Sequence, residues 1–318
     1  MLTRDSGVDI FPLMDPDGRA YLRRAAFQGA HELGLFQALS GRPGGMSAVE
    51  LASSLGTAPR RLRALLDVLV LEQALGRMDN LYFLQMTPPF ETPLPRRGWG
   101  LVADTIRQDR PLAALPQPEE VFQRYHNHLR ASGSGNAAEV AAQSSVQEGE
   151  ILDAGGGTGA YTAACLDAAP NARATVVDFP EVIDLARQAL VPYGTRVHFI
   201  QGDIREVALG EGYQAALMAN LLHLYGPESC ALLVSRVAAA LRPGGRLVVL
   251  DLRIDPERRA PASSVLFTLN MALYTEEGDV HDAERIGGWL LHAGLIETQQ
   301  HALKSAPNIL LLTARRPG

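Results

Sequence analysis

Residues 151–162 read ILDAGGGTGAYT, and this stretch decides the fold. Apolar residues and Asp153 form the end of a strand, four glycines between Gly155 and Gly159 form a loop, and a helix begins after them. Glycines let a backbone approach a ligand closely, and the N-terminus of a helix offers free N–H donors. The stretch therefore predicts a strand–loop–helix unit that binds a small ligand at the loop.

The residues around the loop exclude one kind of site and weaken another. A phosphate-binding loop would continue with Lys and then Ser or Thr, but Ala160 and Tyr161 follow here. The spacing Gly155-x-Gly157-x-x-Ala160 still satisfies the loose dinucleotide fingerprint. Asp153 argues against a dinucleotide, because a carboxylate two residues before the first glycine would repel a pyrophosphate. The same carboxylate suits a ligand that carries a positively charged amino group.

Two further acids end the next two predicted strands. Asp178 closes RATVVD, where a carboxylate can bind both ribose hydroxyls, and Asp203 closes VHFIQGD, where it can accept from an adenine amino group. Open α/β sheets bind ligands at the carboxyl ends of their strands. Each acid alone could instead cap the following helix. The three acids together favour a nucleoside with an aminoacyl sulfonium tail.

The C-terminal part of the chain predicts an α/β fold. Strands and helices alternate from residue 148 onward, which is typical of a Rossmann-like, mostly parallel sheet with helices on both faces. We expect seven strands, in the segments EILDAG, RATVVD, VHFIQGD, YQAALMAN, RLVVLD, ETQQHALK and NILLLTAR.

The N-terminal part is mostly helical. Ser47, Glu50 and Gly56 predict a helix with a capping box and a glycine stop, and APRRLRALLDVLVLEQAL predicts the next helix, with arginines on one face. GRMDNLYFLQMTPP then predicts a short hairpin with an Asp-Asn turn. This order is typical of a winged helix. We therefore divide the chain into a winged-helix domain (1–95), a helical linker that contributes to the acceptor pocket (96–147) and a catalytic domain (148–318).

Composition narrows the class of protein. The 318 residues are 47% hydrophobic and 20% charged, with a net charge of -6, as in a globular protein without the basic face that nucleic acid requires. No apolar run reaches the ~18 residues of a membrane helix, and the N-terminus lacks a signal-peptide pattern. Two cysteines, Cys165 and Cys230, form no disulfide framework. We expect a cytoplasmic protein with no membrane or nucleic-acid partner.

As a set, these motifs resemble the class I S-adenosylmethionine-dependent methyltransferases, and most of all the small-molecule O-methyltransferases of the plant caffeate and bacterial hydroxyneurosporene type. The resemblance covers nearly the whole chain, through ELGLFQAL, MSAVELASSLGTAPRRLRALLDVL, DAGGGTG, VVDFPEVIDLA, GDI and LRPGGRLVVLD. It implies a homodimer formed by the N-terminal domains and a small, partly apolar acceptor, aromatic or polyketide-like. It also implies that S-adenosylmethionine is bound by Asp153, Gly155, Gly157, Asp178, Phe179, Asp203, Ile204 and Asn220.

The stretch MANLLHLYGPESC, residues 218–230, carries the expected catalytic residue. The resemblance places His223 on the family's catalytic histidine, which removes a proton from the acceptor hydroxyl during in-line methyl transfer. A phenol titrates near pH ~10, so a base with a pKa near ~6.5 makes it a better nucleophile at neutral pH. The match is incomplete, because Leu224 and Tyr225 replace the family's Asp and Trp. The second of two family glutamates falls near Val280, where no acid stands.

The missing acids leave two alternatives to O-methylation. His281 follows Val280, so His223 and His281 could form part of a metal site in an enzyme that methylates an activated carbon, such as that of a keto acid. We expect no metal but keep this alternative open, together with a solvent-exposed His281. The other alternative is a non-catalytic protein that binds S-adenosylmethionine or a ligand and works through its winged helix.

The segment SSVLFTLNMALYT supplies the remaining acceptor-site candidates. The resemblance places this helix at the acceptor site, and spacing puts Phe267, Asn270, Met271 and Tyr274 on one face. A plain hydrophobic core is the alternative, although a buried Asn270 would then need a hydrogen bond. We add His281 to this acceptor set, and Trp99 and YHNH (residues 125–128) as segments that could reach the pocket from the linker.

Overall fold

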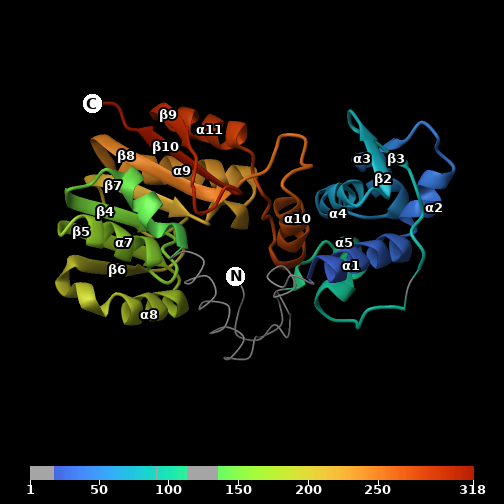
Figure 1. Cartoon of the computed structure of the whole chain (residues 1–318), viewed down its shortest axis with the longest axis horizontal. Coiled ribbons are helices and arrows are strands. Elements are labelled where there is room, and N and C mark those ends of the chain that lie inside the picture. Colours follow the sequence, from blue (N-terminus) through green and yellow to red (C-terminus); the bar gives the residue numbers. More distant parts are fainter. Residues whose placement is uncertain (1–17, 91, 113–134) are drawn as a thin grey trace. The chain divides into compact units, whose positions relative to one another are not determined.

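The computed structural model describes residues 18–90, 92–112 and 135–318. These residues fall into two compact units (Figure 1). Among the described residues, one unit comprises those from 18 to 112 together with 254–280, and the other comprises 135–253 and 281–318. The domain boundaries at residues 95 and 147 stay a prediction. Residues 254–280, which we assigned to the catalytic domain, pack with the N-terminal unit.

The N-terminal unit contains the helix–turn–helix and hairpin of the prediction. Its three short strands form an antiparallel sheet in the order β1-β3-β2, and the hairpin turns at Asp79, whose φ is 52°. The elements of this unit are α1 (Gly18–Leu33), α2 (Leu35–Ser40), β1 (Met46–Ser47), α3 (Ala48–Leu55), α4 (Pro59–Leu71), β2 (Leu75–Met78), β3 (Leu81–Leu84), the 3-10 helix η2 (Gly98–Leu101), α5 (Val102–Gln108) and α10 (Ala262–Tyr274).

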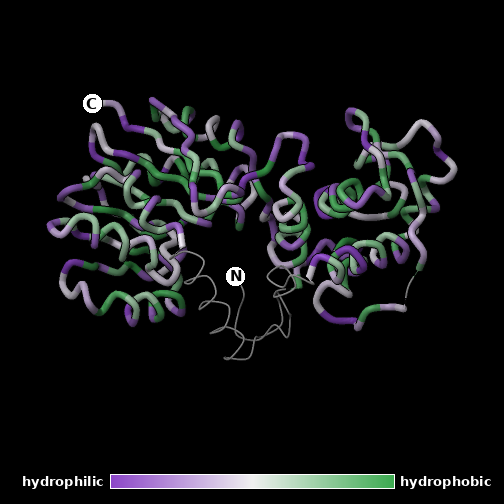
Figure 2. The backbone as a smooth tube through the Cα atoms, viewed as in Figure 1, coloured by the Kyte–Doolittle hydropathy of each residue, from purple (hydrophilic) through white to green (hydrophobic). Residues whose placement is uncertain are grey.

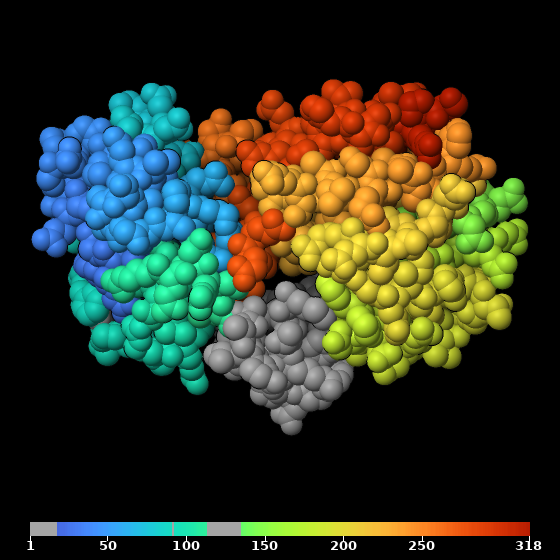
Figure 3. Space-filling view, turned by 180° about the vertical axis from the view of Figure 1, so that it is seen from behind, coloured from blue at the N-terminus to red at the C-terminus, as the bar shows by residue number. Residues whose placement is uncertain are grey.

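Helix α10 belongs to this unit because it packs against α4 and α5, although many residues separate them in the sequence. Figure 3 shows the orange surface of this segment adjoining the blue and blue-green surface of the N-terminal residues. Buried Arg61 of α4 donates to the carbonyl oxygens of Ala272 and Thr275 at the end of α10, and Arg60 donates to that of Gly278 at 3.0 Å. Arg61 therefore satisfies carbonyls that the end of a helix leaves without partners, and Arg60 holds the loop that follows.

A buried ion-pair network fastens the segments on either side of α10 to the same unit. Arg258 donates to Asp67 at 2.7 Å and to Asp279 at 2.6 Å, and Arg77 donates to Asp67 at 3.2 Å. Burial raises the pKa of Asp67, and the surrounding arginines oppose that shift. Asp67 is thus a buried carboxylate that is held by several cations, as burial of a charge requires.

The C-terminal unit is the predicted seven-stranded sheet, in the order β6-β5-β4-β7-β8-β10-β9. Strands β6 to β8 are parallel, and β10 pairs antiparallel with both β8 and β9. The fold class is confirmed. The elements are β4 (Glu148–Ala154), α7 (Ala160–Ala168), β5 (Asn171–Asp178), α8 (Pro180–Ala189), η4 (Val191–Arg196), β6 (Val197–Gln201), β7 (Tyr213–Ala219), η5 (Leu222–Leu224), α9 (Pro227–Ala240), β8 (Leu241–Leu252), α11 (Ala283–His292), β9 (Ile296–His301) and β10 (Ile309–Arg315).

Alternate residues of the central strands enter two different cores, because successive side chains of a strand point to opposite faces. Ile151 and Leu217 pack with α7 and the helical residues 135–144 on one face. Leu152 and Met218 pack with α9 and α11 on the other. Figure 2 shows the resulting hydrophobic colouring of the central strands. Helices thus cover both faces of the sheet and leave the carboxyl ends of its strands for ligands.

Among the described residues, no helix has both the length and the apolar character that a membrane crossing requires.

The capping box of α3 gives a test of the predicted N-terminal fold. The Ser47 hydroxyl accepts from the Glu50 N–H at 3.3 Å, and the Glu50 carboxylate accepts from the Ser47 N–H at 2.8 Å. Ser47→Ala should destabilise the helix by about 1 kcal/mol, which is roughly fivefold in local opening. Native-state hydrogen exchange of the α3 amides measures this change. Exposed Ser53→Ala is the control, and equal protection in the two variants would contradict the expectation.

Candidate active site

The candidate active site is built at the carboxyl ends of β4, β5, β7 and β8. Strands β5 and β6 lie on one side of β4, and β7 and β8 lie on its other side. The order of the strands thus reverses between β4 and β7, which is where open α/β sheets bind ligands. The glycine loop follows β4, and residues 220–223 follow β7. The two segments meet, because a Cβ atom on Gly155 would lie 2.6 Å from the side chain of Leu221.

The glycine loop has the backbone that its sequence predicts. Gly155 and Gly157 have φ angles of 71° and 57°, in the left-handed region that favours glycine. A Cβ atom on Gly155 would clash with the side chain of Leu221. A Cβ atom on Gly157 would meet no atom within 4 Å, so the loop is open to a ligand at that position.

Asp153 lies at the end of β4 and is completely buried. Its Oδ2 accepts from the Thr162 hydroxyl at 2.5 Å, whereas its buried Oδ1 has no hydrogen-bond partner among the described residues. Burial raises the pKa of Asp153 to about 6, against the hydrogen bond from Thr162 and with the help of nearby Asp178. A buried carboxylate oxygen without a donor suits a positively charged group on a ligand.

Asp178 lies at the end of β5 and organises the loop. Its two carboxylate oxygens accept from the N–H groups of Gly157 at 2.9 Å and Phe179 at 2.8 Å. Burial raises the pKa of Asp178, and these two backbone donors oppose the rise. The carboxylate therefore fixes both the loop and the start of α8. The capping use of this acid and its use for a ligand can coexist, because each carboxylate oxygen has further lone pairs.

Asp203 and its neighbour Ile204 have different surroundings. Arg205 donates to both oxygens of Asp203, at distances between 2.5 and 3.0 Å. This hydrogen bonding outweighs partial burial and lowers the pKa of Asp203. The side chain of Ile204 is buried in the core beside α9. An adenine amino group would have to share the Asp203 carboxylate with Arg205.

His223 forms a buried dyad with Asp251, which ends β8. Its Nδ1 lies 2.7 Å from Asp251 Oδ1, and its backbone N–H donates to Oδ2 at 3.1 Å. Burial by itself would raise the pKa of Asp251. The His223 imidazole and the N–H groups of Leu252 and His223 outweigh burial and hold that pKa below its usual value. Asp251 is therefore an ionised acceptor that holds the Nδ1–H tautomer of His223 and directs Nε2 away from itself.

Sequence reasoning missed Asp251, although a signal for it was present. We used the rule that an acid ends a strand for Asp153, Asp178 and Asp203, and RLVVLD ends in an acid in the same way. Its role was hidden because Asp251 is 28 residues away from His223 in the sequence. Only the pairing of β7 with β8 brings the two together.

His281 is buried in the same unit, so the alternative of a solvent-exposed residue is wrong, while its expected place in the acceptor set stays a prediction. Its Nε2 lies 2.9 Å from the carbonyl oxygen of Tyr225 and 3.5 Å from the Cys230 sulfur, and its ring packs edge-on against Trp289. No three or more His, Cys, Asp or Glu side chains are grouped to hold a metal ion within residues 18–90, 92–112 and 135–318. The alternative of a metal held by His223 and His281 together with substrate oxygens stays a prediction.

The other acceptor candidates lie on α10, in the N-terminal unit. Asn270, Met271 and Tyr274 are buried, and Phe267 is partly exposed. The Asn270 carbonyl oxygen accepts from the Trp99 indole N–H at 3.3 Å, which is the hydrogen bond that a buried asparagine needs. Residues 125–128 lie outside the described residues, so their expected contribution stays a prediction.

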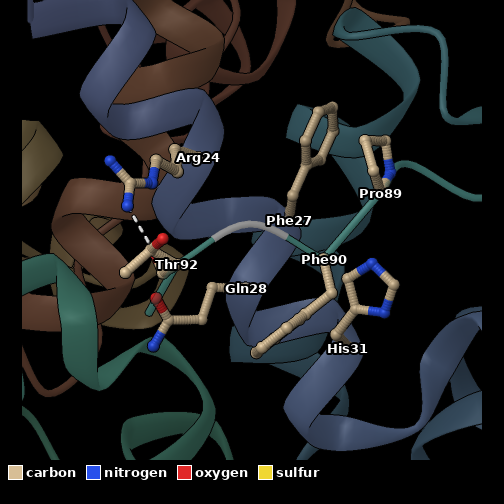
Figure 4. Close-up of a pocket in the computed structure, with 7 residues that line it drawn as sticks. All are labelled: Arg24, Phe27, Gln28, His31, Pro89, Phe90 and Thr92. Atoms are coloured by element: carbon tan, nitrogen blue, oxygen red, sulfur yellow. Dashed lines mark hydrogen bonds between the residues drawn. The ribbon is translucent and has the colours of Figure 1, made fainter. Parts of the chain in front are cut away.

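The N-terminal unit also contains a cavity of about 10 Å³ between α1 and the segment after β3. Figure 4 shows that the rings of Phe27, His31 and Phe90 gather around it, while Arg24 donates to the Thr92 carbonyl. A space of this size holds at most one water molecule, so it is no acceptor site. The lining residues are Arg24, Phe27, Gln28, His31, Pro89, Phe90 and Thr92.

Comparison with known proteins identifies the class of this protein. Residues 115–295 match the O-methyltransferase domain, and residues 19–85 match the O-methyltransferase dimerisation domain. The chain is 28% identical to the tetracenomycin polyketide synthesis 8-O-methyltransferase TcmO of Streptomyces glaucescens over 94% of each chain.

Solved structures share the fold. An O-methyltransferase family 2 protein of Planctomyces limnophilus, solved with apigenin, has a TM-score of 0.73 at 22% identity over 99% of this chain and 100% of that one. Human N-acetylserotonin methyltransferase, solved with S-adenosylmethionine, has a TM-score of 0.60 at 23% identity over 98% and 99%. The chain belongs to this O-methyltransferase family and is an S-adenosylmethionine-dependent O-methyltransferase.

The burial of Asp153 predicts how stability and cofactor binding change with pH. Its folded pKa of about 6 lies above the unfolded value near ~3.9, so the free energy of unfolding should fall as pH rises between these values. The sequence predicts that Asp153 binds the ammonium group of the cofactor. On this prediction, binding of S-adenosylhomocysteine should strengthen over the same interval, because only the ionised carboxylate attracts that group.

Denaturant unfolding and calorimetry between pH 4.5 and pH 7.5 measure these two slopes. Asp153→Asn should remove both contributions, whereas Asp184→Asn, at an exposed acid of α8, should leave them as in the wild type. Unchanged slopes in Asp153→Asn would exclude Asp153 as their source.

Proposed function

We propose that this enzyme methylates a hydroxyl group of a small, partly apolar acceptor of aromatic or polyketide-like character, with His223 as the general base. The observation that supports the proposal best is the buried pair of His223 and Asp251, at 2.7 Å. TcmO, which is named for its part in tetracenomycin polyketide synthesis, supports the acceptor class.

The dyad provides a route for the acceptor's proton. Asp251 accepts a hydrogen bond from the Nδ1–H of His223. In this tautomer the lone pair of the neutral ring is on Nε2, which is the nitrogen that receives the proton of the acceptor hydroxyl. As the proton moves to Nε2, the imidazole becomes positive beside an ionised carboxylate, which stabilises that charge. The hydroxyl oxygen meanwhile gains the electron density it needs for attack.

The residues at the carboxyl ends of β4 to β6 fit the cofactor. We propose that Asp153 Oδ1 accepts from the ammonium group, that Asp178 binds the ribose hydroxyls beside Gly157, and that Asp203 faces the adenine. Phe179, Ile204 and Asn220 complete this proposed set. When bound, S-adenosylmethionine supplies a methyl group on a positively charged sulfur, which departs as a neutral thioether once the acceptor oxygen has taken the methyl.

We expect His223→Ala to lower kcat by about 10²–10⁴-fold, the usual contribution of a general base. Asp251→Asn should lower kcat as well, because it keeps a hydrogen-bond acceptor but loses the charge that stabilises the imidazolium. Neither variant should change the Kd for S-adenosylhomocysteine by more than about twofold, since neither side chain belongs to the proposed cofactor set.

Steady-state kinetics with a panel of phenolic acceptors, together with calorimetry, measure both quantities. If wild type and His223→Ala methylate the phenols at equal rates, His223 is not the general base. Loss of wild-type activity after treatment with a chelator, restored by a divalent metal, would favour the carbon-methylation alternative instead.

We further propose that the chain forms a homodimer through residues 19–85, which match the dimerisation domain. Multi-angle light scattering should give twice the chain mass of 34.3 kDa at micromolar concentration. A mass equal to that of one chain across this range would contradict the dimer without affecting the proposed chemistry.

A further inference from the structure

The hydroxyl of Tyr161 lies between two asparagine amides in the C-terminal unit. It donates to Asn136 Oδ1 at 3.0 Å, and it accepts from Asn220 Nδ2 at 3.3 Å. Tyr161 stands two residues after Gly159, in the first turn of α7. This side chain follows the glycine loop directly, and neither the loop nor the dyad gives it a role.

All three residues are held in place by their surroundings. Tyr161 is buried in the core together with Ala137 and Val140, which dock the helical residues 135–144 onto the sheet. Asn220 has a left-handed backbone with a φ of 54°, and its N–H donates to the Leu250 carbonyl at 2.7 Å. Asparagine tolerates this backbone better than most residues, and the contact of its amide with the Tyr161 hydroxyl holds the side chain.

The hydrogen bonds of the Tyr161 hydroxyl determine which end of the Asn220 amide faces it. A tyrosine hydroxyl has one proton, and that of Tyr161 goes to Asn136. Its oxygen can therefore only accept from Asn220, which must present its Nδ2–H₂ group. Turning the amide over would set the lone pairs of Oδ1 against those of the tyrosine oxygen. Asn220 Oδ1 is thus the atom left for a ligand, on a side chain that is partly exposed.

Asn220 belongs to the segment that contacts the glycine loop and carries the dyad histidine. The next residue, Leu221, packs against Gly155, and His223 follows two residues later. Burial raises the pKa of Tyr161 to about 12, against its bonds to Asn220 and Asn136 and with the help of Asp153 and Asp251. The phenol therefore keeps its proton, and remains a donor to Asn136, throughout the working range of pH.

We propose that Tyr161 is a positioning residue that turns the carbonyl oxygen of Asn220 toward the positively charged methionine end of the cofactor. This inference rests on the proposed cofactor site and adds a residue to it. Two positively polarised groups of the cofactor could contact the Asn220 carbonyl oxygen: the ammonium group and the methyl group on the sulfonium. Both are attracted to a carbonyl oxygen, and only S-adenosylmethionine carries the second.

Tyr161→Phe removes the hydroxyl and keeps the ring. Its Kd for S-adenosylmethionine should rise by about threefold to tenfold, which is the usual effect of losing one hydrogen bond that orients a binding group. Calorimetry with S-adenosylmethionine and S-adenosylhomocysteine separates the two sources of positive charge. Equal weakening of both ligands assigns the contact to the ammonium group, and weakening of S-adenosylmethionine alone assigns it to the sulfonium methyl. Unchanged affinity for both overturns the proposal.

Tyr193→Phe is the matched control. The Tyr193 hydroxyl donates to Asp167 at 3.0 Å, so this variant also loses one side-chain hydrogen bond in the same unit. It should bind both ligands as the wild type does. Asn136→Leu breaks the same chain of hydrogen bonds without changing α7. It should weaken the affinity for the cofactor as Tyr161→Phe does, and it provides a second test if Tyr161→Phe folds poorly.

A double variant separates positioning from a general structural role. Asn220→Gly removes the side chain and keeps the left-handed backbone. If Tyr161 acts through Asn220, adding Tyr161→Phe to Asn220→Gly should cause no further loss of affinity. Additive losses would contradict the proposal. A wild-type protein that binds neither ligand, or an Asp178→Ala variant that binds as the wild type, would instead refute the proposed cofactor site itself.

Discussion

The parallel pairing of β4 with β7 is the interaction on which the C-terminal unit depends. It sets Asp153 beside Leu217, so the chain leaves β4 as the glycine loop and leaves β7 as residues 220–223 at the same edge of the sheet. The left-handed backbone of Gly155 leaves room for Leu221, which closes the contact between the two segments. A side chain at Gly155 would therefore disturb the loop and the segment that carries His223 together.

The acids at this edge are stabilised in different ways, and the difference indicates their roles. Asp178 accepts from two backbone N–H groups, and Asp251 is paired with His223, so each is supported within the fold. Asp153 accepts from one hydroxyl, its Oδ1 has no hydrogen-bond partner among the described residues, and burial raises its pKa. A buried carboxylate is costly by itself and becomes favourable once a cation pairs with it. This difference supports the proposal that Asp153 binds a positively charged group of the ligand.

Much of the fold could be predicted because its signals are local. Alternating apolar strands, the glycine loop and the capping box at Ser47 depend on neighbours a few residues away, and each of them forms as expected. The placement of α10 could not be predicted in this way. It packs against α4, where Arg61 donates to carbonyls at the end of α10 that lie more than 200 residues further along the chain. No periodicity in either segment records that contact.

The sequence by itself determined the α/β class and the acids at the strand ends, because each of these is a residue type at a fixed distance from a local motif, and its resemblance to a family singled out His223 as the proposed base. Only the tertiary structure decided that Asp251 supports His223, that His281 is buried against Tyr225 and Trp289, and that Tyr161 fixes the amide of Asn220. These are hydrogen bonds and packing contacts between segments that meet through strand order. Strand order depends on the whole hydrophobic core rather than on any one stretch of residues.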